Sequence, residues 1–417
     1  MRNLVIFLLL FSVLTGCNRS TKEATLLNTL EKTLAFSEQQ ALTMARSLAN
    51  NPGKLPKSID KEGKLETCNS SWWVSGFFPG ELWYLYGHSK NDSLKYWAEE
   101  FTNRVADQQY TTNNHDVGFM IYCSFGNAFR FTHENQYLPA IHNAAKSLST
   151  RFNSLIGCTR SWDRSPWNSK WQYAVIIDNM MNLELLEVAS KKFNEPGFAE
   201  IAERHANTTM KNHFRPDGSS YHVISYDTLT GQPEKKNTAQ GYSDESSWAR
   251  GQAWGLYGFT MMYRETGKRE YLKQAIKIAD FLINHPNLPS DKIPYWDFNA
   301  PDIPNAKRDV SAGAIMCSAL LELQLYAENE KSKQYLSIAE EQLNSLCSAA
   351  YLAGKGENAN FLLKHSVGNM PNGTEIDVPL SYADYYFVEA MTRYIRLMKK
   401  EPLFPDYRVA HDSVVEH

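Results

Sequence analysis

The sequence of 417 residues predicts an all-α protein built as an (α/α)6 barrel, a closed ring of six helical hairpins. Two observations predict this fold class. Apolar residues recur with helical spacing through most of the chain, and two kinds of helix alternate along it. One kind is poor in charge and rich in Gly, Ala, Ser and aromatic residues, as expected for a helix buried on most sides. The other kind has one charged and one apolar face, as a half-exposed helix does.

The helices of the first kind are expected to form the inner ring, and they are 72–87, 117–131, 173–190, 245–266, 309–327 and 382–398. The amphipathic helices are expected to form the outer ring, and they are 25–50, 93–107, 136–152, 197–213, 269–285 and 331–349. Such hairpins bury their apolar faces only against neighbouring hairpins, so closing the ring removes both exposed ends. An open helical solenoid is the alternative, although its repeats are shorter and more regular.

Long connections precede the inner helices, whereas short turns follow them. The long connections are 51–71, 108–115, 153–172, 214–243, 286–308 and 350–380. In a barrel this order places all of them at one end. Long loops in a compact domain are usually functional, so one rim of the barrel is expected to hold the site.

The N-terminus, "MRNLVIFLLLFSVLTGC", has a positive charge at Arg2, an apolar run too short to span a bilayer, and small residues before Cys17. This pattern predicts a lipoprotein signal peptide over 1–16, with Cys17 lipidated after cleavage. A tether over 17–24, the barrel over 25–400 and a tail over 401–417 complete the expected organisation. The expectation is an exported lipoprotein of a Gram-negative bacterium, anchored through Cys17 on the periplasmic side of the membrane.

Composition argues against several classes of partner. The formal net charge of -3 gives no electrostatic reason to expect binding to nucleic acid. The five cysteines after Cys17 are scattered and form no Cys/His pattern for zinc, so no metal is expected. Phosphate-binding and dinucleotide-binding motifs are not found, so no cofactor is expected either. A monomer without a predicted disulfide is the simplest expectation.

Carboxylates stand near the expected starts of the inner helices. Asp116, Asp244 and Asp309 could each simply cap a helix, because a helix N-terminus offers free N–H groups. Asp178 lies within "AVIIDNMMN", several residues into an expected apolar helix and too late to cap it. Burial there would raise its pKa, which suits a general acid. The alternative is a buried aspartate satisfied by a neighbouring hydroxyl or amide. If Asp116 faces the same cavity, the two carboxyl groups influence each other's titration.

Groups suited to a sugar gather at the same rim. Aromatic rings offer flat apolar faces that suit sugar rings as well as cores. Arg250 is a natural partner for a carboxylate substrate, although a salt bridge with Asp244 or Glu245 is the alternative. The candidate residues are His115, His222, Gln240, Arg250, Trp72, Trp162, Trp248 and Trp254.

Six motifs stand in order along the chain: "WxxGFFPGELW", "HDVGF", "IIDNMMNLELL", "QGYSDESSWARGQAWGLYG", "RDVSAGAI" and "ADYYFVEAM". Together they resemble glycoside hydrolase family 88, the unsaturated glucuronyl hydrolases, over residues 70 to 398. The resemblance implies an (α/α)6 barrel, in agreement with the helix pattern. It also implies an enzyme that removes the 4,5-unsaturated uronic acid left by polysaccharide lyases at the non-reducing end of glycosaminoglycan disaccharides and short oligosaccharides.

The resemblance implies how the chemistry proceeds and which residues take part. Family members protonate C4 of an enol ether, water adds at C5, and the hemiketal collapses to release the next sugar. By resemblance Asp178 is the general acid/base, and Asp116 is a second essential carboxylate that orients the substrate. The residues that match family positions around the uronate are His222, Gln240, Trp248, Arg250 and Trp254, with His115, Trp162, Trp72, Phe77 and Tyr385 as further contacts. Tyr382 is an open alternative to Tyr385.

Two other functions remain open from the sequence. One is a hydrolase of the neighbouring family that acts on unsaturated rhamnogalacturonan fragments with the same barrel and chemistry. The other is a sugar-binding lipoprotein without catalysis, although a binding surface has no need of a buried acid such as Asp178. The segment 350–380 is expected to shape the site for the leaving sugar, and within it Lys364, His365 and Ser366 could meet a sulfate.

Overall fold

The computed structural model describes the backbone of residues 2–404 and the side chains of residues 23–404. The predicted lipidation residue, Cys17, and most of the predicted tail over 401–417 therefore lie outside the described side chains. None of the helices in the described part of the chain has an apolar stretch long enough to cross a membrane. The five cysteines with described side chains are all free.

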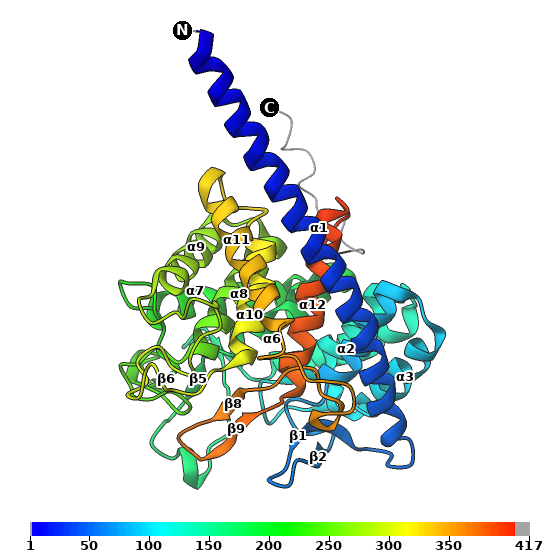
Figure 1. The fold of residues 1–417 in the computed structure, drawn as a ribbon. Helices are drawn as coiled ribbons and strands as arrows, with labels where there is room; N and C mark the ends of the chain where they lie inside the picture. The colour runs from blue at the N-terminus through cyan, green and yellow to red at the C-terminus, as the bar shows by residue number, and fades with distance from the viewer. Residues whose placement is uncertain (1, 405–417) are drawn as a thin grey trace.

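The inner ring consists of six helical segments, as predicted. They are α2 (Phe77–Ser89), the π-helical η2 (Gly118–Gly126) continued by α4 (Asn127–Thr132), α6 (Asn179–Phe193), α8 (Ala249–Thr266), α10 (Val310–Leu323) and α12 (Ser381–Met398). Each packs against the next, and α12 packs against α2, so the ring is closed (Figure 1). The (α/α)6 barrel predicted from helix alternation is confirmed.

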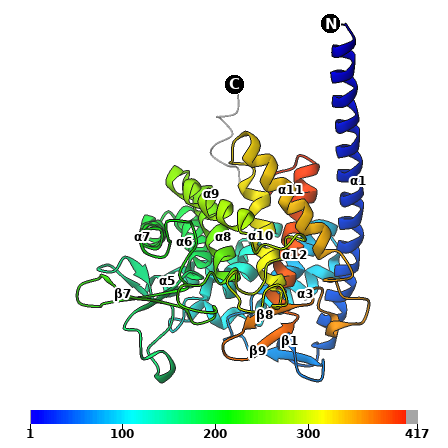
Figure 2. The same cartoon turned by 60° about the vertical axis from the view of Figure 1, so that its left-hand side comes forward.

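The outer ring consists of the amphipathic helices. They are α1 (Arg2–Ser47), α3 (Asp92–Asn103), α5 (Leu138–Ser149), α7 (Pro196–Asn212), α9 (Arg269–Asn284) and α11 (Asn329–Leu346). Each outer helix buries its apolar face against the inner ring, and α1 runs beside α12, α2 and α3 before its N-terminal part projects past the barrel (Figures 1 and 2).

The long connections carry short antiparallel strands that the helical pattern did not predict. The strands are β1 (Leu55–Ile59), β2 (Leu65–Cys68), β3 (Phe152–Asn153), β4 (Cys158–Thr159), β5 (Ala174–Ile176), β6 (Val223–Tyr226), β7 (Pro233–Asn237), β8 (Ser366–Asn369) and β9 (Thr374–Val378). They pair as β1–β2, β3–β4, β5–β6–β7 and β8–β9. The strands labelled in Figures 1 and 2 lie at the end of the barrel away from the projecting part of α1, so the predicted gathering of long connections at one rim is confirmed.

The predicted start of the third inner helix is wrong, and this affects Asp178. The helix expected over 173–190 begins only at Asn179, because residues 174–176 form the strand β5 and pair with β6. A short apolar run fits a buried strand as well as a buried helix. Asp178 therefore stands at the N-cap position of α6 rather than inside the helix, yet its side chain makes no capping hydrogen bond.

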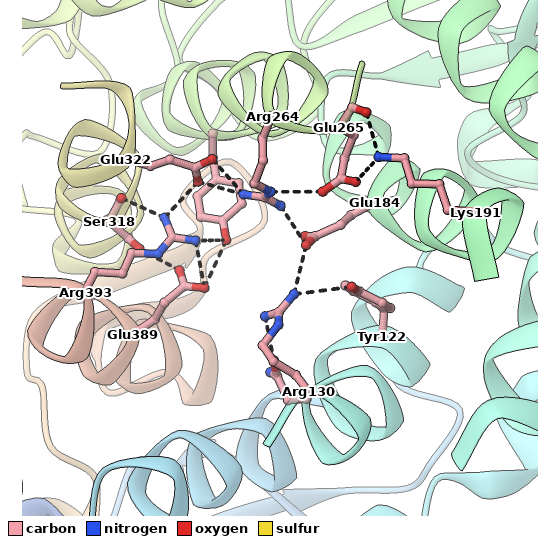
Figure 3. A network of polar contacts seen from close by, with 12 residues as sticks. Tyr122, Arg130, Glu184, Lys191, Arg264, Glu265, Ser318, Glu322, Glu389 and Arg393 are labelled. Atoms are coloured by element: carbon pink, nitrogen blue, oxygen red, sulfur yellow. Dashed lines mark hydrogen bonds and ion pairs between the residues drawn. The ribbon is translucent and has the colours of Figure 1, made fainter. Parts of the chain in front are cut away.

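The half of the barrel away from the rim holds a buried network of ion pairs (Figure 3). Arg264, in the last turn of α8, lies within ion-pair distance of Glu184, Glu265 and Glu322. Arg393 of α12 pairs with Glu322 and Glu389, while Arg130 of α4 and Lys191 of α6 pair with Glu184 and Glu265. The network joins α4, α6, α8, α10 and α12, so charge pairing as well as apolar packing ties the inner helices together.

Candidate active site

A pocket of about 950 Å³ opens at the rim formed by the long connections. Five of the six long connections, together with the helix starts that follow them, supply its lining. Seven of the predicted residues line it, and they are Trp72, His115, Asp116, Trp162, Asp178, Gln240 and Arg250. The ring closure thus brings together side chains that are more than 170 residues apart in sequence.

Asp178 reaches the pocket from the junction of β5 and α6. Its side chain is buried, and Oδ2 has no hydrogen-bond partner among the described residues. Burial raises the pKa of Asp178 to about 6, against the opposing effects of His115 and Arg250. The nearby Asp116 contributes to this rise, as expected for two carboxyl groups in one cavity. Asp178 is therefore a carboxyl group that can hold or release a proton near neutral pH.

Asp116 stands just before η2, the π-helical segment that the sequence showed only as an aromatic-rich helix. Its side chain does not cap this helix, and the N–H of Phe119 bonds instead to Oδ1 of Asn182 at 2.9 Å. Burial raises the pKa of Asp116 to about 7, while Arg151 opposes the shift. The capping interpretation therefore fails for Asp116.

The carboxylates of Asp309 and Asp244, the other two candidate helix caps, both accept backbone hydrogen bonds. Asp309 does cap α10, since its carboxylate accepts hydrogen bonds from the N–H groups of Ser311 and Ala312. Asp244 accepts hydrogen bonds from the N–H of Thr238 and the side chain of Asn237, within the connection before α8. Asp309 lies outside the pocket lining and pairs with Arg250, whereas Asp244 lines the pocket with its carboxylate held by Asn237 and Thr238.

Arg250 forms an ion pair, but not with the predicted partners. Its guanidinium lies 3.1 Å from Asp309 rather than beside Asp244 or Glu245, and it donates to the carbonyl oxygens of Val367 and Gly368 in β8. It also lies 4.6 Å from the ring of Trp248. The arginine thus holds the β8–β9 hairpin against the barrel and lines the pocket, although its side chain is almost fully buried.

Replacing Arg250 with alanine is expected to raise KM by about tenfold to a hundredfold, the effect of losing a charge-assisted hydrogen bond. Steady-state kinetics would measure this change. Arg308→Ala is a matched control, because Arg308 pairs with Asp291 and stacks on Tyr295 without lining the pocket. If both variants leave KM unchanged, Arg250 serves only to hold the hairpin.

The other predicted contacts lie behind the lining. His222 and Trp248 are buried against each other, with ring centroids 4.4 Å apart. Phe77 and Trp254 are buried beneath the pocket, where both pack against Phe119. These four side chains support the pocket from below and from one side rather than forming its surface.

The choice between two tyrosines of α12 can be made from their surroundings. The hydroxyl of Tyr385 accepts a hydrogen bond from Asn127, well below the pocket. Tyr382 lies instead 4.8 Å from the ring of Trp73, and Arg250 lies 5.3 Å from its ring. Tyr382 is therefore the tyrosine next to the pocket wall, and Tyr385 belongs to the barrel interior.

Several lining residues were missed in the sequence. Trp73 lines the pocket next to the predicted Trp72, and Trp167 and Trp171 form an aromatic group with Trp162. Three tryptophans within "SWDRSPWNSKW", in one long connection, are the signal that could have found them. From the segment 350–380 the lining comes from residues 368–375, whereas Lys364, His365 and Ser366 lie outside it.

Two carboxyl groups with raised pKa values beside tryptophan faces fit the site of a glycoside hydrolase. No protein-family model matches the chain. It is 44% identical over 406 residues, 96% of this chain and 100% of the relative, to an unsaturated glucuronyl hydrolase of Formosa agariphila. The chain belongs to the family of unsaturated glucuronyl hydrolases.

Solved structures agree with this assignment. The crystal structure of an unsaturated glucuronyl hydrolase specific for heparin matches with a TM-score of 0.86 at 46% identity, covering 90% of this chain and 99% of that one. An aspartate-to-asparagine variant of the Streptococcus agalactiae enzyme, complexed with dGlcA-GalNAc6S, matches with a TM-score of 0.75 at 26% identity, covering 90% and 93%.

Proposed function

We propose that the protein removes the 4,5-unsaturated uronic acid from the non-reducing end of glycosaminoglycan disaccharides and short oligosaccharides. Relatives named for heparin and for chondroitin disaccharides support this substrate class. The observation that carries the proposal is Asp178, a buried carboxyl group with a free oxygen and a raised pKa in the wall of a tryptophan-lined pocket.

In the proposed reaction Asp178 is the general acid/base. Its proton goes to C4 of the enol ether, and positive charge develops at C5 and the ring oxygen. Water then adds at C5 and gives a proton back to Asp178, which leaves a hemiketal. The hemiketal opens and releases the next sugar, so one water is consumed and Asp178 ends as it began. Arg250 and the tryptophans hold the uronate in place.

The pH dependence of kcat/KM is expected to follow from the raised pKa values. A general acid must carry its proton, and the protonated fraction of Asp178 falls as pH rises through about 6. Asp116 loses its proton as pH rises through about 7, which adds negative charge beside the anionic substrate. kcat/KM should therefore decline above about pH 6, in a pH-rate profile measured at constant ionic strength. A profile that rises through this range would contradict the acid role.

The experiment that tests the function follows the near-ultraviolet absorbance of the enol ether. Purified residues 18–417 are mixed with lyase-generated chondroitin and heparin disaccharides, and with unsaturated rhamnogalacturonan fragments. Loss of absorbance on glycosaminoglycan disaccharides is expected, and the relative rates identify the preferred glycan. Loss only on rhamnogalacturonan fragments would move the assignment to the neighbouring substrate class. No loss on any substrate would leave a binding protein.

We also propose that the protein is exported and anchored through a lipid on Cys17, facing the periplasm. The signal-like sequence before Cys17 supports this location. Mass spectrometry of the protein from a Gram-negative host would reveal a chain beginning at Cys17 with attached acyl groups. A chain that retains residues 1–16 would contradict the proposal.

A further inference from the structure

His115 stands beside Asp116, and its ring is held in one orientation. The Nδ1 atom lies 2.9 Å from the carbonyl oxygen of Ser161. A carbonyl oxygen can only accept a hydrogen bond, so Nδ1 must carry a proton. The Ser161 hydroxyl is fixed in turn, because it accepts from the N–H of Ile176 and donates to Oδ1 of Asn179. The same strand-to-helix junction that presents Asp178 therefore also sets the tautomer of His115.

The second ring nitrogen of His115 faces the carboxyl group of Asp116. Nε2 is buried without a hydrogen-bond partner among the described residues, and it lies 3.2 Å from Oδ1 of Asp116. In a neutral ring with its proton on Nδ1, Nε2 offers only a lone pair. An ionised Asp116 would set that lone pair against a carboxylate oxygen, with no hydrogen between them. One shared proton, on either atom, turns the unfavourable contact into a hydrogen bond.

His222, which lies behind the lining next to Trp248, has the opposite tautomer. Its Nδ1 atom accepts hydrogen bonds from the N–H groups of Ala239 and Gln240 at 3.1 and 3.2 Å. A nitrogen that accepts from two N–H groups carries no proton, so the proton of the neutral ring is on Nε2. Nε2 lies 3.7 Å from Oδ2 of Asp178. The two histidines thus present a lone pair to Asp116 and an N–H to Asp178.

We propose that His115 is a positioning residue which keeps one proton on the His115–Asp116 pair, and so leaves Asp178 as the carboxyl group that changes its ionisation during the reaction. This inference rests on the proposed function. The His115–Asp116 pair stays neutral as a unit, which lowers the repulsion that an anionic substrate would meet at this wall of the pocket.

The surrounding charges agree with a proton held on Asp116. Burial lowers the pKa of His115 to about 4 and raises that of Asp116 to about 7, so the carboxyl group is the better holder of the shared proton. The charged and titratable groups that act on the pair or border it are Asp178, Arg151 with its partner Asp163, Arg250, His205 and His222. Of these groups, Arg151 lowers the pKa of His115 and also that of Asp116, because its positive charge disfavours a bound proton on either side chain.

The tautomers can be measured without any substrate. In the enzyme labelled with ¹⁵N-histidine, the resonances lost in His115→Gln identify His115, and those lost in His222→Gln identify His222. The expected spectra show His115 with a protonated Nδ1 and His222 with a protonated Nε2. A neutral His115 with its proton on Nε2 would overturn the proposal.

Two variants of His115 then separate a proton-holding role from a merely structural one. Asparagine reproduces the Nδ1 donor toward Ser161 but has no atom at the position of Nε2, whereas the longer glutamine side chain reaches that position. Titration of ¹³Cγ-labelled aspartates, with Asp116 assigned from Asp116→Asn, is expected to show the pKa of Asp116 lowered by about one unit in His115→Asn and much less in His115→Gln. His142→Gln, on the outer helix α5, is the control and should leave the titration unchanged.

Each result of this titration decides for or against the proposal. An Asp116 pKa that is the same in His115→Asn as in the unaltered enzyme overturns it, and equal shifts in the asparagine and glutamine variants do so too. If His115→Asn does not fold, the tautomer of His115, assigned with His115→Gln, still tests the proposal, and a proton on Nε2 overturns it. Failure of the proposed function is seen separately, as constant enol-ether absorbance in the enzyme assay.

Discussion

Replacing Asp178 with asparagine is expected to lower kcat by about 10³- to 10⁴-fold, the upper part of the range for loss of a general acid/base. Asparagine has nearly the same shape but cannot give a proton to C4 or take one from water. The side chain makes no capping bond to α6, and its Oδ2 atom has no hydrogen-bond partner among the described residues. The fold and the substrate affinity should therefore change little.

Three measurements separate this effect from damage to the fold. They are kcat from the loss of enol-ether absorbance, the substrate Kd by calorimetry, and Tm. Asp60→Asn is the matched control, since Asp60 lies in the exposed turn between β1 and β2 and accepts only backbone N–H groups. Activity of Asp178→Asn within about tenfold of the unaltered enzyme would remove Asp178 as the acid/base.

Replacing Arg264 with methionine is expected to lower the free energy of unfolding by about 3–5 kcal/mol, the effect of removing one partner from a buried ion pair. Methionine fills a similar volume without the charge. Arg264 lies 2.7 Å from Glu184, 2.7 Å from Glu322 and 3.0 Å from Glu265, and all four side chains are buried. The variant leaves these carboxylates in a low-dielectric interior with fewer cations to balance them.

Denaturant unfolding followed by circular dichroism would measure this loss. Arg269→Met on the outer helix α9 is the control, because its guanidinium pairs with Glu328 at the exposed surface and should contribute about 0.5 kcal/mol or less. Equal stability of the two variants would show that the network in Figure 3 contributes no more than a surface ion pair. The pH optimum of Arg264→Met should stay that of the unaltered enzyme, because the network lies away from the pocket.

The barrel could be predicted from the sequence because a buried helix has a different amino-acid composition from a half-exposed one. An inner helix has neighbours on nearly every side, so it has few charged residues. The alternation of such helices with amphipathic ones can be recognised whatever the lengths of the loops between them. The start of α6 could not be predicted, since "AVII" is apolar in a strand and in a helix alike. What decides in favour of a strand is pairing of Val175 with Ile224, a contact that local sequence does not encode.

The carboxyl groups of the site could be predicted from the sequence more readily than the contacts that its side chains make. Asp178 was recognisable as a carboxylate in apolar surroundings, whereas Asp116 could have been a helix cap and its role came from the family resemblance. Both line the pocket, Asp178 buried and Asp116 half-buried. The partner of Arg250 could not be predicted, because Asp309 is 59 residues away and only the packing of α8 against α10 brings the two together. Likewise, only three-dimensional packing shows that Trp254 supports the pocket from beneath while Trp73 forms its surface.

The floor of the pocket determines how a saccharide chain can be used. Beneath the lining, Phe77, Phe119, Trp254 and Tyr386 form a continuous buried layer of rings, and the ion-pair network lies beyond it. In the part of the chain that the structure describes, these packed rings leave a saccharide no passage through the barrel, so it enters from the rim. Only a chain end can enter, and the remainder of the saccharide stays in solvent. This geometry favours an exo-acting enzyme, which removes one terminal unit each time a saccharide end enters the pocket.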